Sequence, residues 1–176
     1  MRYLYYCLYR IARLLPSSSA SHWPLCSFYT VIRSTLARKL IEEMGPCVGV
    51  EQGAHFGSGK GIKIGARSSL GIDCNIAGPC SIGCDVLMGP NVKIKTLNHR
   101  FSRTDIPILK QGVSPTRPIA IGNDVWLGDS CIILPGTVIG DGCIVGAGSV
   151  VRGEFPPMAI IVGNPAQISA MREHRT

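Results

Sequence analysis

Residues 64–93 read IGARSS LGIDCN IAGPCS IGCDVL MGPNVK, and residues 121–150 read IGNDVW LGDSCI ILPGTV IGDGCI VGAGSV. In both stretches an aliphatic residue opens every group of six, glycine usually follows it, and the fifth residue is small or β-branched. An α-helix cannot use a period of six, because about 3.6 residues per turn would carry the aliphatic position around its whole surface. The repeat therefore predicts short strands separated by frequent turns.

Three such groups make one circuit of a triangular prism, with the aliphatic and the small residue of each group pointing inward. Successive circuits then hydrogen-bond as parallel strands about 4.8 Å apart. The groups between Val50 and Val151 predict somewhat under five coils. Cysteines fall on inward small positions, where a thiol packs as a compact hydrophobe, and we favour this structural interpretation over a redox or metal-binding one. These cysteines are Cys74, Cys80, Cys131 and Cys143.

The composition fits a single folded domain with a short appendage. The chain has 176 residues, of which 45% are hydrophobic and 16% charged, and this excludes a disordered acidic chain. The net charge is +7, but no dense Lys/Arg run is present, so nucleic acid is not an expected partner. Eight cysteines without a CxxC motif or a signal peptide favour a reducing, cytoplasmic location.

The N-terminal segment differs in character from the repeats. Residues 1–15, MRYLYYCLYRIARLL, are too short and too often interrupted by arginine to span a bilayer. Two alternatives stay open: a helix that packs on its own domain or a neighbouring subunit, and a peripheral contact with the inner membrane. Residues 24–44 predict an amphipathic helix. We thus expect an appendage over residues 1–49, coils over 50–154 with an extruded loop at 100–120, and a tail over 155–176.

The repeats resemble those of the hexapeptide-repeat acyltransferases, and the pattern MGPNVKI, NH, QG, IGNDVWLG is most similar to the sugar and polysaccharide O-acetyltransferases. The resemblance covers about residues 50–168. It implies an all-β fold, a left-handed parallel β-helix with an N-terminal helical appendage and a short C-terminal tail or helix. It also implies a homotrimer that uses acetyl-CoA as co-substrate and an acceptor sugar or glycan precursor.

The repeat is interrupted by one long excursion, residues 100–120, and His99 stands directly before it. In the family a histidine at this place is the general base, and the loop reaches a neighbouring subunit. An alcohol needs such a base while it attacks a thioester, and imidazole titrates near neutral pH. The resemblance thus implies a catalytic His99, with Asn98 as a candidate to orient it. The alternative is a histidine that only caps the loop.

Two further positions match residues that contact the acceptor in the family. Asn91 corresponds to an asparagine that positions the sugar hydroxyl, although asparagine is also an ordinary turn residue. Trp126 occupies a position where an exposed aromatic ring stacks on a sugar or lines the coenzyme groove. We therefore predict Asn91 and Trp126 as substrate-binding residues.

The coenzyme positions follow from the resemblance as well. Small residues suit a place where backbone must approach the pantetheine arm closely, and basic residues suit the phosphates. Relatives usually carry Lys or Arg where this chain has Gln167, so the phosphate contact is expected from an arginine elsewhere. The predicted coenzyme-binding residues are Gly128, Ala147, Gly148, Arg152, Pro165 and Arg172.

No metal is expected at the site. A γ-type carbonic anhydrase, the main rival within this fold, needs three zinc histidines, and the coils contain His55 and His99. The predicted function is transfer of acetyl to a sugar hydroxyl in capsule, exopolysaccharide or lipopolysaccharide synthesis, by direct attack on the thioester. The alternatives are acetylation of a free serine, galactoside or drug, and a non-catalytic β-helical scaffold.

Overall fold

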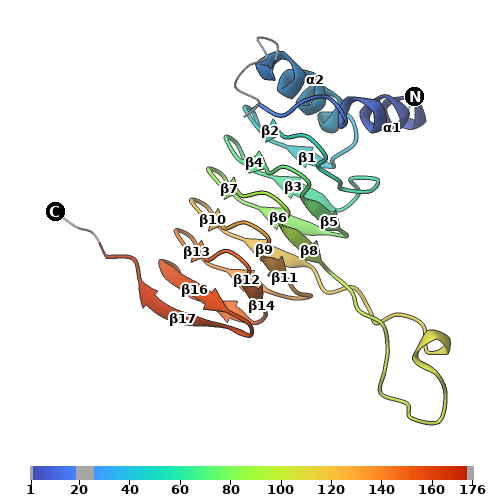
Figure 1. Ribbon diagram of the computed structural model, residues 1–176, viewed down its shortest axis with the longest axis vertical. Coiled ribbons are helices and arrows are strands. Elements are labelled where there is room, and N and C mark those ends of the chain that lie inside the picture. Colours follow the sequence, from blue (N-terminus) through green and yellow to red (C-terminus); the bar gives the residue numbers. More distant parts are fainter. Residues whose placement is uncertain (1, 19–25, 174–176) are drawn as a thin grey trace.

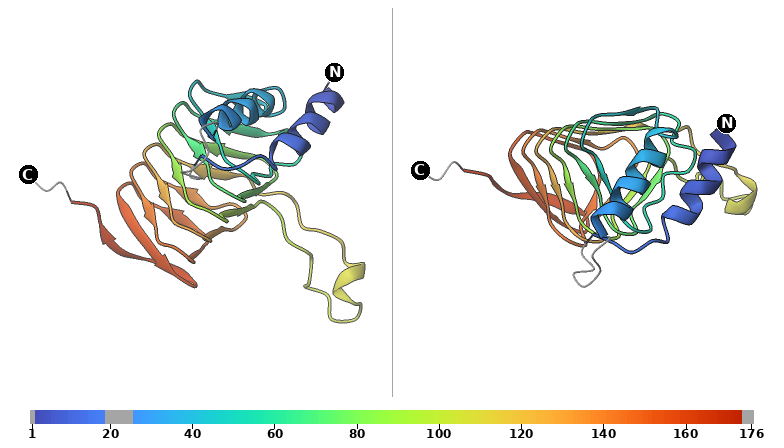
Figure 2. Two further views of the ribbon diagram at one scale, coloured as in Figure 1. Left: turned by 45° about the horizontal axis from the view of Figure 1, so that its top comes forward. Right: turned by 90° about the horizontal axis from the view of Figure 1, so that it is seen from above.

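The computed structural model describes residues 2–18 and 26–173, and they form a parallel β-helix capped at one end by two helices (Figure 1). The helices α1 (Arg2–Ala12) and α2 (Cys26–Arg38) lie across the N-terminal end of the coils. A long loop projects sideways from the middle of the coils (Figure 2). The strands are two or three residues long in most coils, because a turn follows every group of six.

The coils have three faces, which we call A, B and C. Face A is a sheet of six strands: β1 (Glu43–Met44), β3 (Ile62–Ile64), β6 (Cys80–Ile82), β9 (Ile119–Ile121), β12 (Val138–Ile139) and β15 (Glu154–Phe155). Face B contains β2 (Gly49–Val50), β4 (Ser69–Leu70), β7 (Leu87–Met88), β10 (Trp126–Leu127), β13 (Ile144–Val145), β16 (Ala159–Gly163) and β17 (Ala166–Met171). Face C contains β5 (Asn75–Ala77), β8 (Lys93–Lys95), β11 (Ile132–Ile133) and β14 (Val150–Val151).

The register places equivalent residues directly above one another. On face A the partners run in a ladder from Ile64 through Ile82, Ile121 and Ile139 to Phe155. All of these side chains are buried, as are the other aliphatic and small positions of the repeat between Val50 and Val151. The predicted prism core is thus confirmed, and its apolar ladders supply the main driving force for the fold.

The coils extend further at both ends than the repeat predicts. The expected helix over residues 24–44, whose first residues lie outside the described part, ends at Arg38, and Glu43–Met44 pairs with β3 as the first strand of face A. The guanidinium of Arg38 fixes this turn by donating to the carbonyls of Met44 and Gly45. The coils therefore begin before residue 50, and six strands stack on face A where fewer than five coils were expected.

The C-terminal segment is a pair of strands, so the expectation of a plain tail or a helix is wrong for residues 159–171. β16 adds to face B in parallel with β13, and β17 then folds back antiparallel to β16. The strand forms because Ala159 and Ile161 alternate inward and are fully buried. Residues 174–176 lie outside the described part.

The inward cysteines give a first testable prediction. Cys74, Cys80 and Cys131 are buried, and burial raises the pKa of each thiol to about 12. Because the thiolate is the reactive form, we expect these three to resist alkylation in the native protein, while the exposed Cys7 and Cys47 are labelled. Brief iodoacetamide treatment followed by peptide mass spectrometry measures this. Equal labelling of both groups in folded protein would contradict the inward placement.

Candidate active site

The long loop leaves the coils at the corner between faces C and A, after β8 and before β9. Its two arms pair at the base, where His99 bridges to Val113 in antiparallel fashion. The Ser114 N–H donates to the Asn98 carbonyl at 2.8 Å, and the Arg100 N–H donates to the Gly112 carbonyl at 3.0 Å. The sequence excursion thus becomes a two-armed ribbon that holds His99 at its root.

The outer part of the loop is tied by its own side chains. The Gln111 amide donates to the carbonyls of Arg103 at 2.8 Å and Ile106 at 3.1 Å, just after the short 3-10 helix η1 (Ile108–Lys110). Arg103 forms an exposed ion pair with Asp105, which lowers the pKa of that carboxyl. Asp105 therefore pairs with an arginine of its own loop.

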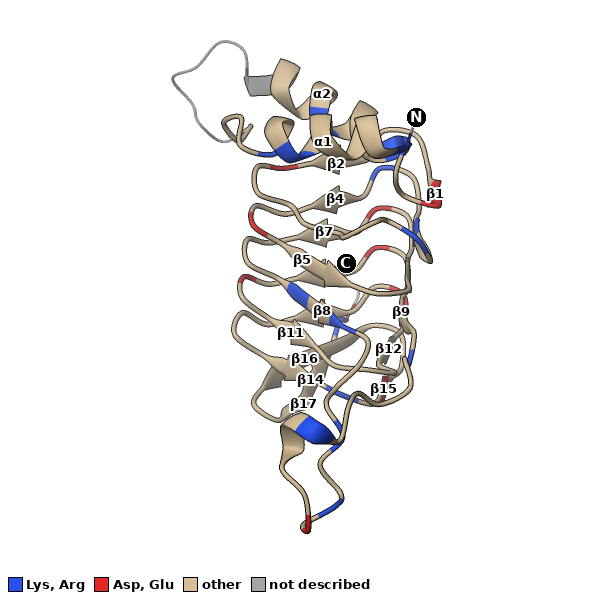
Figure 3. Ribbon diagram, turned by 90° about the vertical axis from the view of Figure 1, so that its right-hand side faces the viewer, with Lys and Arg blue, Asp and Glu red and all other residues tan. Residues whose placement is uncertain are grey.

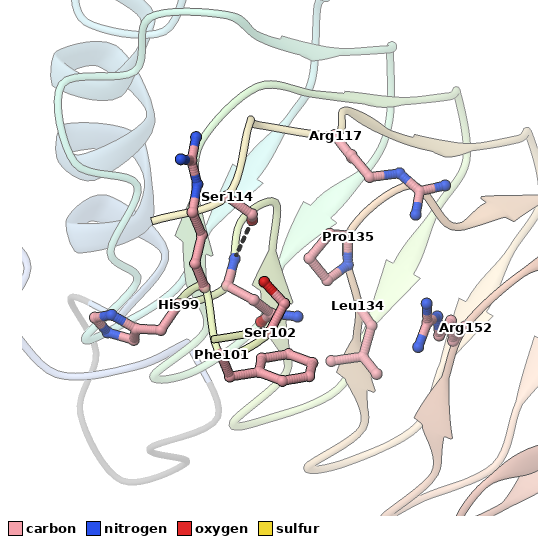
Figure 4. Close-up of a pocket in the computed structure, with 10 residues that line it drawn as sticks. His99, Phe101, Ser102, Ser114, Arg117, Leu134, Pro135 and Arg152 are labelled. Carbon is pink, nitrogen blue, oxygen red and sulfur yellow. Dashed lines mark hydrogen bonds between the residues drawn. The ribbon is translucent and has the colours of Figure 1, made fainter. Parts of the chain in front are cut away.

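A cavity of about 300 Å³ lies at this corner (Figure 4). Its walls come from the first residues of the loop, from the returning arm and from the coils that follow. They are Asn98, His99, Arg100, Phe101, Ser102, Ser114, Arg117, Leu134, Pro135 and Arg152. The predicted residues His99, Asn98 and Arg152 are thus brought together in one protomer, and the lining contains no acidic residue.

Two arginines make the C-terminal side of the cavity cationic. Arg152 follows β14, and the Arg117 guanidinium lies against Gly136, where an added Cβ would come within 2.8 Å of it. Neither arginine forms an ion pair with another of the described residues. Arg117 is a site residue that the sequence analysis missed, although the net positive charge of residues 100–120 pointed to it.

His99 faces outward from its own prism. Its imidazole points away from the side of the cavity where Leu134 and Arg152 lie (Figure 4). Ser114 binds both backbone groups of Asn98: its hydroxyl accepts from the Asn98 N–H at 3.0 Å, and its own N–H donates to the Asn98 carbonyl. The side-chain amide of Asn98 forms no hydrogen bond with a described residue. In this structure the backbone of Asn98 therefore holds the two arms of the loop together, and its side chain does not contact the His99 imidazole through a hydrogen bond.

The predicted acceptor residues lie elsewhere on the same protomer. Asn91 occupies the corner between faces B and C with a φ of 59°, and its N–H donates to the Ile72 carbonyl at 2.7 Å. Asp73 and Ser130 adopt the same left-handed conformation in the coils before and after it, so this is a turn position of the fold. Trp126 lies on face B between Leu87 and Ile144, with half of its surface exposed.

The predicted coenzyme positions divide between the two regions. Gly128 and Ala147 stack so closely that a Cβ on the glycine would lie 2.6 Å from the Ala147 nitrogen, and Gly148 faces open space with a φ of 69°. Pro165 lies in the turn between β16 and β17. Arg172 donates to the Asp124 carboxylate at 3.0 Å and the Gly142 carbonyl at 2.8 Å, so its charge is already paired. Arg152 is the one member of the set in the His99 cavity.

The other coil histidine is set apart from this cavity. His55 lies on the face C side beside Asn75, and its Nδ1 is buried without a hydrogen-bond partner among the described residues. Burial, together with the nearby cations Arg13, Arg10 and Lys95, lowers its pKa. Within residues 2–18 and 26–173, no three His, Cys, Asp or Glu side chains gather closely enough to hold a metal ion.

Comparison with known proteins agrees with this architecture. Residues 118–153 match the bacterial transferase hexapeptide (six repeats) family. The chain is 30% identical to the putative lipopolysaccharide biosynthesis O-acetyl transferase WbbJ of Escherichia coli, over 89% of this chain and 94% of that protein. It is 32% identical to the galactoside O-acetyltransferase of E. coli, over 77% of this chain and 66% of that protein.

The solved structures give the same result. The structure of a galactoside acetyltransferase in complex with coenzyme A superposes with a TM-score of 0.78 at 26% identity, over 97% of this chain and 80% of that one. The fold is therefore the left-handed β-helix that the resemblance implied, and its triangular coils are those that the repeats predicted. The chain belongs to the hexapeptide-repeat acetyltransferases.

Proposed function

We propose that this protein transfers the acetyl group of acetyl-CoA to a sugar hydroxyl during the synthesis of a surface glycan such as capsule, exopolysaccharide or lipopolysaccharide. The observation that carries the proposal is the cavity lined by His99 and by three arginines, Arg100, Arg117 and Arg152, none of which forms an ion pair with another described residue. The names of the relatives support a sugar acceptor, since one is a galactoside O-acetyltransferase and another a putative lipopolysaccharide O-acetyl transferase. Four inward cysteines favour a reducing, cytoplasmic setting.

In the proposed reaction His99 acts as general base. The imidazole takes the proton of the acceptor hydroxyl while the oxygen attacks the thioester carbonyl, and a backbone N–H stabilises the oxyanion that forms. Collapse of this intermediate breaks the carbon–sulfur bond, and the imidazolium returns its proton to the coenzyme thiolate. The proposal takes the attack on the thioester as direct, and no cysteine thiol lines the cavity as a carrier of the acetyl group.

The residues present suit acetyl-CoA as the donor. Arg117 and Arg152 offer unpaired guanidinium groups that match the coenzyme phosphates. At the B–C corner, Gly148 faces open space in which an extended chain can approach the backbone closely. Since Gln167 carries no charge and Arg172 is paired with Asp124, Arg152 is the better candidate for the phosphate contact.

We further propose a homotrimer with sites shared between protomers. One protomer supplies His99 and Arg152 at its C–A corner, while Trp126, Asn91 and Gly148 lie on face B or at the B–C corner. Because the His99 imidazole faces outward from its own protomer, it can approach Trp126, Asn91 and Gly148 only if these residues belong to a neighbouring copy. Three copies around an axis bring every such pair of corners together. Light scattering after gel filtration tests the expected trimer.

Arg152→Ala tests the donor side of the site. Loss of one charge-assisted phosphate contact is expected to raise the KM for acetyl-CoA about tenfold and to leave kcat within about threefold. Steady-state kinetics with varied acetyl-CoA measures this. Arg67→Ala is the control, because Arg67 is also exposed but pairs with Asp85 at another corner. An unchanged KM in R152A would remove Arg152 from the coenzyme site.

An acceptor panel tests the function itself. Release of free coenzyme thiol is followed with sugar nucleotides, free glycosides, serine and no acceptor. The proposal expects release that depends on a sugar-containing acceptor. Serine-dependent release would favour a small-molecule acetyltransferase. No thiol release with any acceptor, together with no calorimetric binding of coenzyme A, would favour a scaffold.

A further inference from the structure

Helix α1 is turned with its apolar side toward solvent. Tyr9 packs inward, where its ring lies 4.6 Å from that of Phe56 and its hydroxyl donates to the Ala54 carbonyl at 2.8 Å. Leu4, Leu8 and Ile11 follow one another at helical spacing and are exposed. A surface helix normally buries its apolar stripe, so we expect the exposed stripe of α1 to be covered by a binding partner.

The exposed apolar surface continues beyond α1. Leu14, just after the helix, is 71% exposed, and Phe28 and Val31 on α2 are more than half exposed. Both helices lie at the same end of the coils, opposite the β16–β17 hairpin (Figures 1 and 2). We call this surface the cap surface. Single exposed apolar residues are ordinary, but a set of this size on two adjacent helices marks an interaction site.

Arginines flank the apolar stripe. Arg2 anchors the start of α1 by donating to the carbonyls of Leu40 at 2.7 Å and Ser58 at 2.9 Å, and Arg10 lies 6.0 Å from the centre of the Tyr6 ring. Residues 1–41 contain five arginines and one lysine and no acidic residue. The ribbons of α1 and α2 accordingly carry basic segments and no acidic ones (Figure 3).

From this pattern we infer that the cap surface docks, with α1 in the plane of the interface, on a membrane that contains anionic lipids. Apolar side chains pointing outward would enter the headgroup boundary, and the tyrosines and arginines beside them would meet the headgroups. A second copy of the chain is a poorer occupant, because two cap surfaces would bring the arginines of α1 in both copies together, and neither α1 nor α2 carries an acidic residue to offset them. No helix within residues 2–18 and 26–173 is long and apolar enough to cross a bilayer.

The inference is independent of the chemistry at His99. It adds a location to the enzyme: docking would place the coils upright on the membrane, with the loop and its cavity further from the lipid than the cap. The acceptors that benefit from such a placement are glycans on lipid carriers.

Vesicle sedimentation of the full-length protein tests the inference. Two lipid compositions are compared, pure phosphatidylcholine and an equal mixture of phosphatidylcholine and phosphatidylglycerol. We expect salt-sensitive binding to the anionic vesicles. L4Q/L8Q/I11Q is expected to lower partitioning at least tenfold, and R10Q/R13Q is expected to lower it by a similar factor on anionic vesicles.

Val138→Gln is the matched control, since Val138 is also exposed but lies on face A. Thermal unfolding shows whether each variant is folded. If L4Q/L8Q/I11Q does not fold, the single variant L8Q and the variant R10Q/R13Q test the inference in its place. Wild-type protein that stays in the supernatant with both vesicle types would overturn the inference. A change of oligomeric state in the triple variant without lipid would overturn it too, because the stripe would then be a contact between copies.

Discussion

Replacement of His99 with alanine is expected to lower kcat/KM for the acceptor reaction at least a hundredfold and to leave the dissociation constant of coenzyme A unchanged. The expected loss is large because, in the proposed mechanism, the imidazole removes the hydroxyl proton in the transition state, a role that contributes about 10²–10⁴-fold in enzymes generally. Binding of the coenzyme is preserved because the cationic side of the cavity, formed by Arg117 and Arg152, stays intact. Thiol release and calorimetry measure the two quantities on the same protein.

The matched control is His55→Ala. His55 is the other histidine of the coils, and its buried Nδ1 bonds to no described residue, so truncation breaks no hydrogen bond at that atom. We expect H55A to turn over at nearly the wild-type rate. If H99A retained turnover within about tenfold of wild type, His99 would not be the base.

Arg33→Leu is expected to lower the free energy of unfolding by about 3–5 kcal/mol, because it breaks a buried network that joins the cap to the coils. The Arg33 side chain is fully buried on α2. Its guanidinium donates to the Val50 carbonyl at 2.8 Å, to those of Leu15 and Pro16 at 3.0 and 2.9 Å, and lies 3.5 Å from the Glu51 carboxylate. Loss of the guanidinium leaves the three carbonyl oxygens without this hydrogen-bond donor and the Glu51 carboxylate without its positively charged partner.

Urea unfolding followed by circular dichroism measures this change. Arg67→Leu serves as the control, since the pair between Arg67 and Asp85 is exposed and its loss is expected to change stability little. A shift below about 1 kcal/mol in R33L would show that the cap is held by its apolar contacts, such as Tyr9 against Phe56, and not by the buried arginine.

The repeated part of the fold is predictable from sequence because each coil buries the same two positions. Ile64 and Ile82 are partners in register and each is the first residue of a group of six, so the sequence pattern predicts that they stack on one another. At the N-terminal end the signal was overlooked. Met44 stands six residues before Val50 and is followed by Gly45, and it pairs in register with Ile64 of β3.

His99 was predicted from its position directly before the long excursion, and the structure places it in the lining of a cavity. Its role as general base stays a prediction. Arg117 was missed because it lies on the returning arm of the loop, in a stretch without a repeat, and only folding brings it next to Gly136. Trp126 and Asn91 lie outside the cavity of their own protomer, and only the proposed trimer would bring them beside the cavity of another copy.

A crystal structure of the protein with acetyl-CoA, or a stable analogue of it, tests the central claim most directly. The measured quantity is the distance from the His99 ring to the thioester carbonyl carbon. The account predicts a separation of about 4–6 Å, with room for an acceptor hydroxyl between them, and pantetheine running past Gly128 and Gly148 of a neighbouring copy. A coenzyme bound with its thioester remote from His99, or bound wholly within one copy, would contradict it.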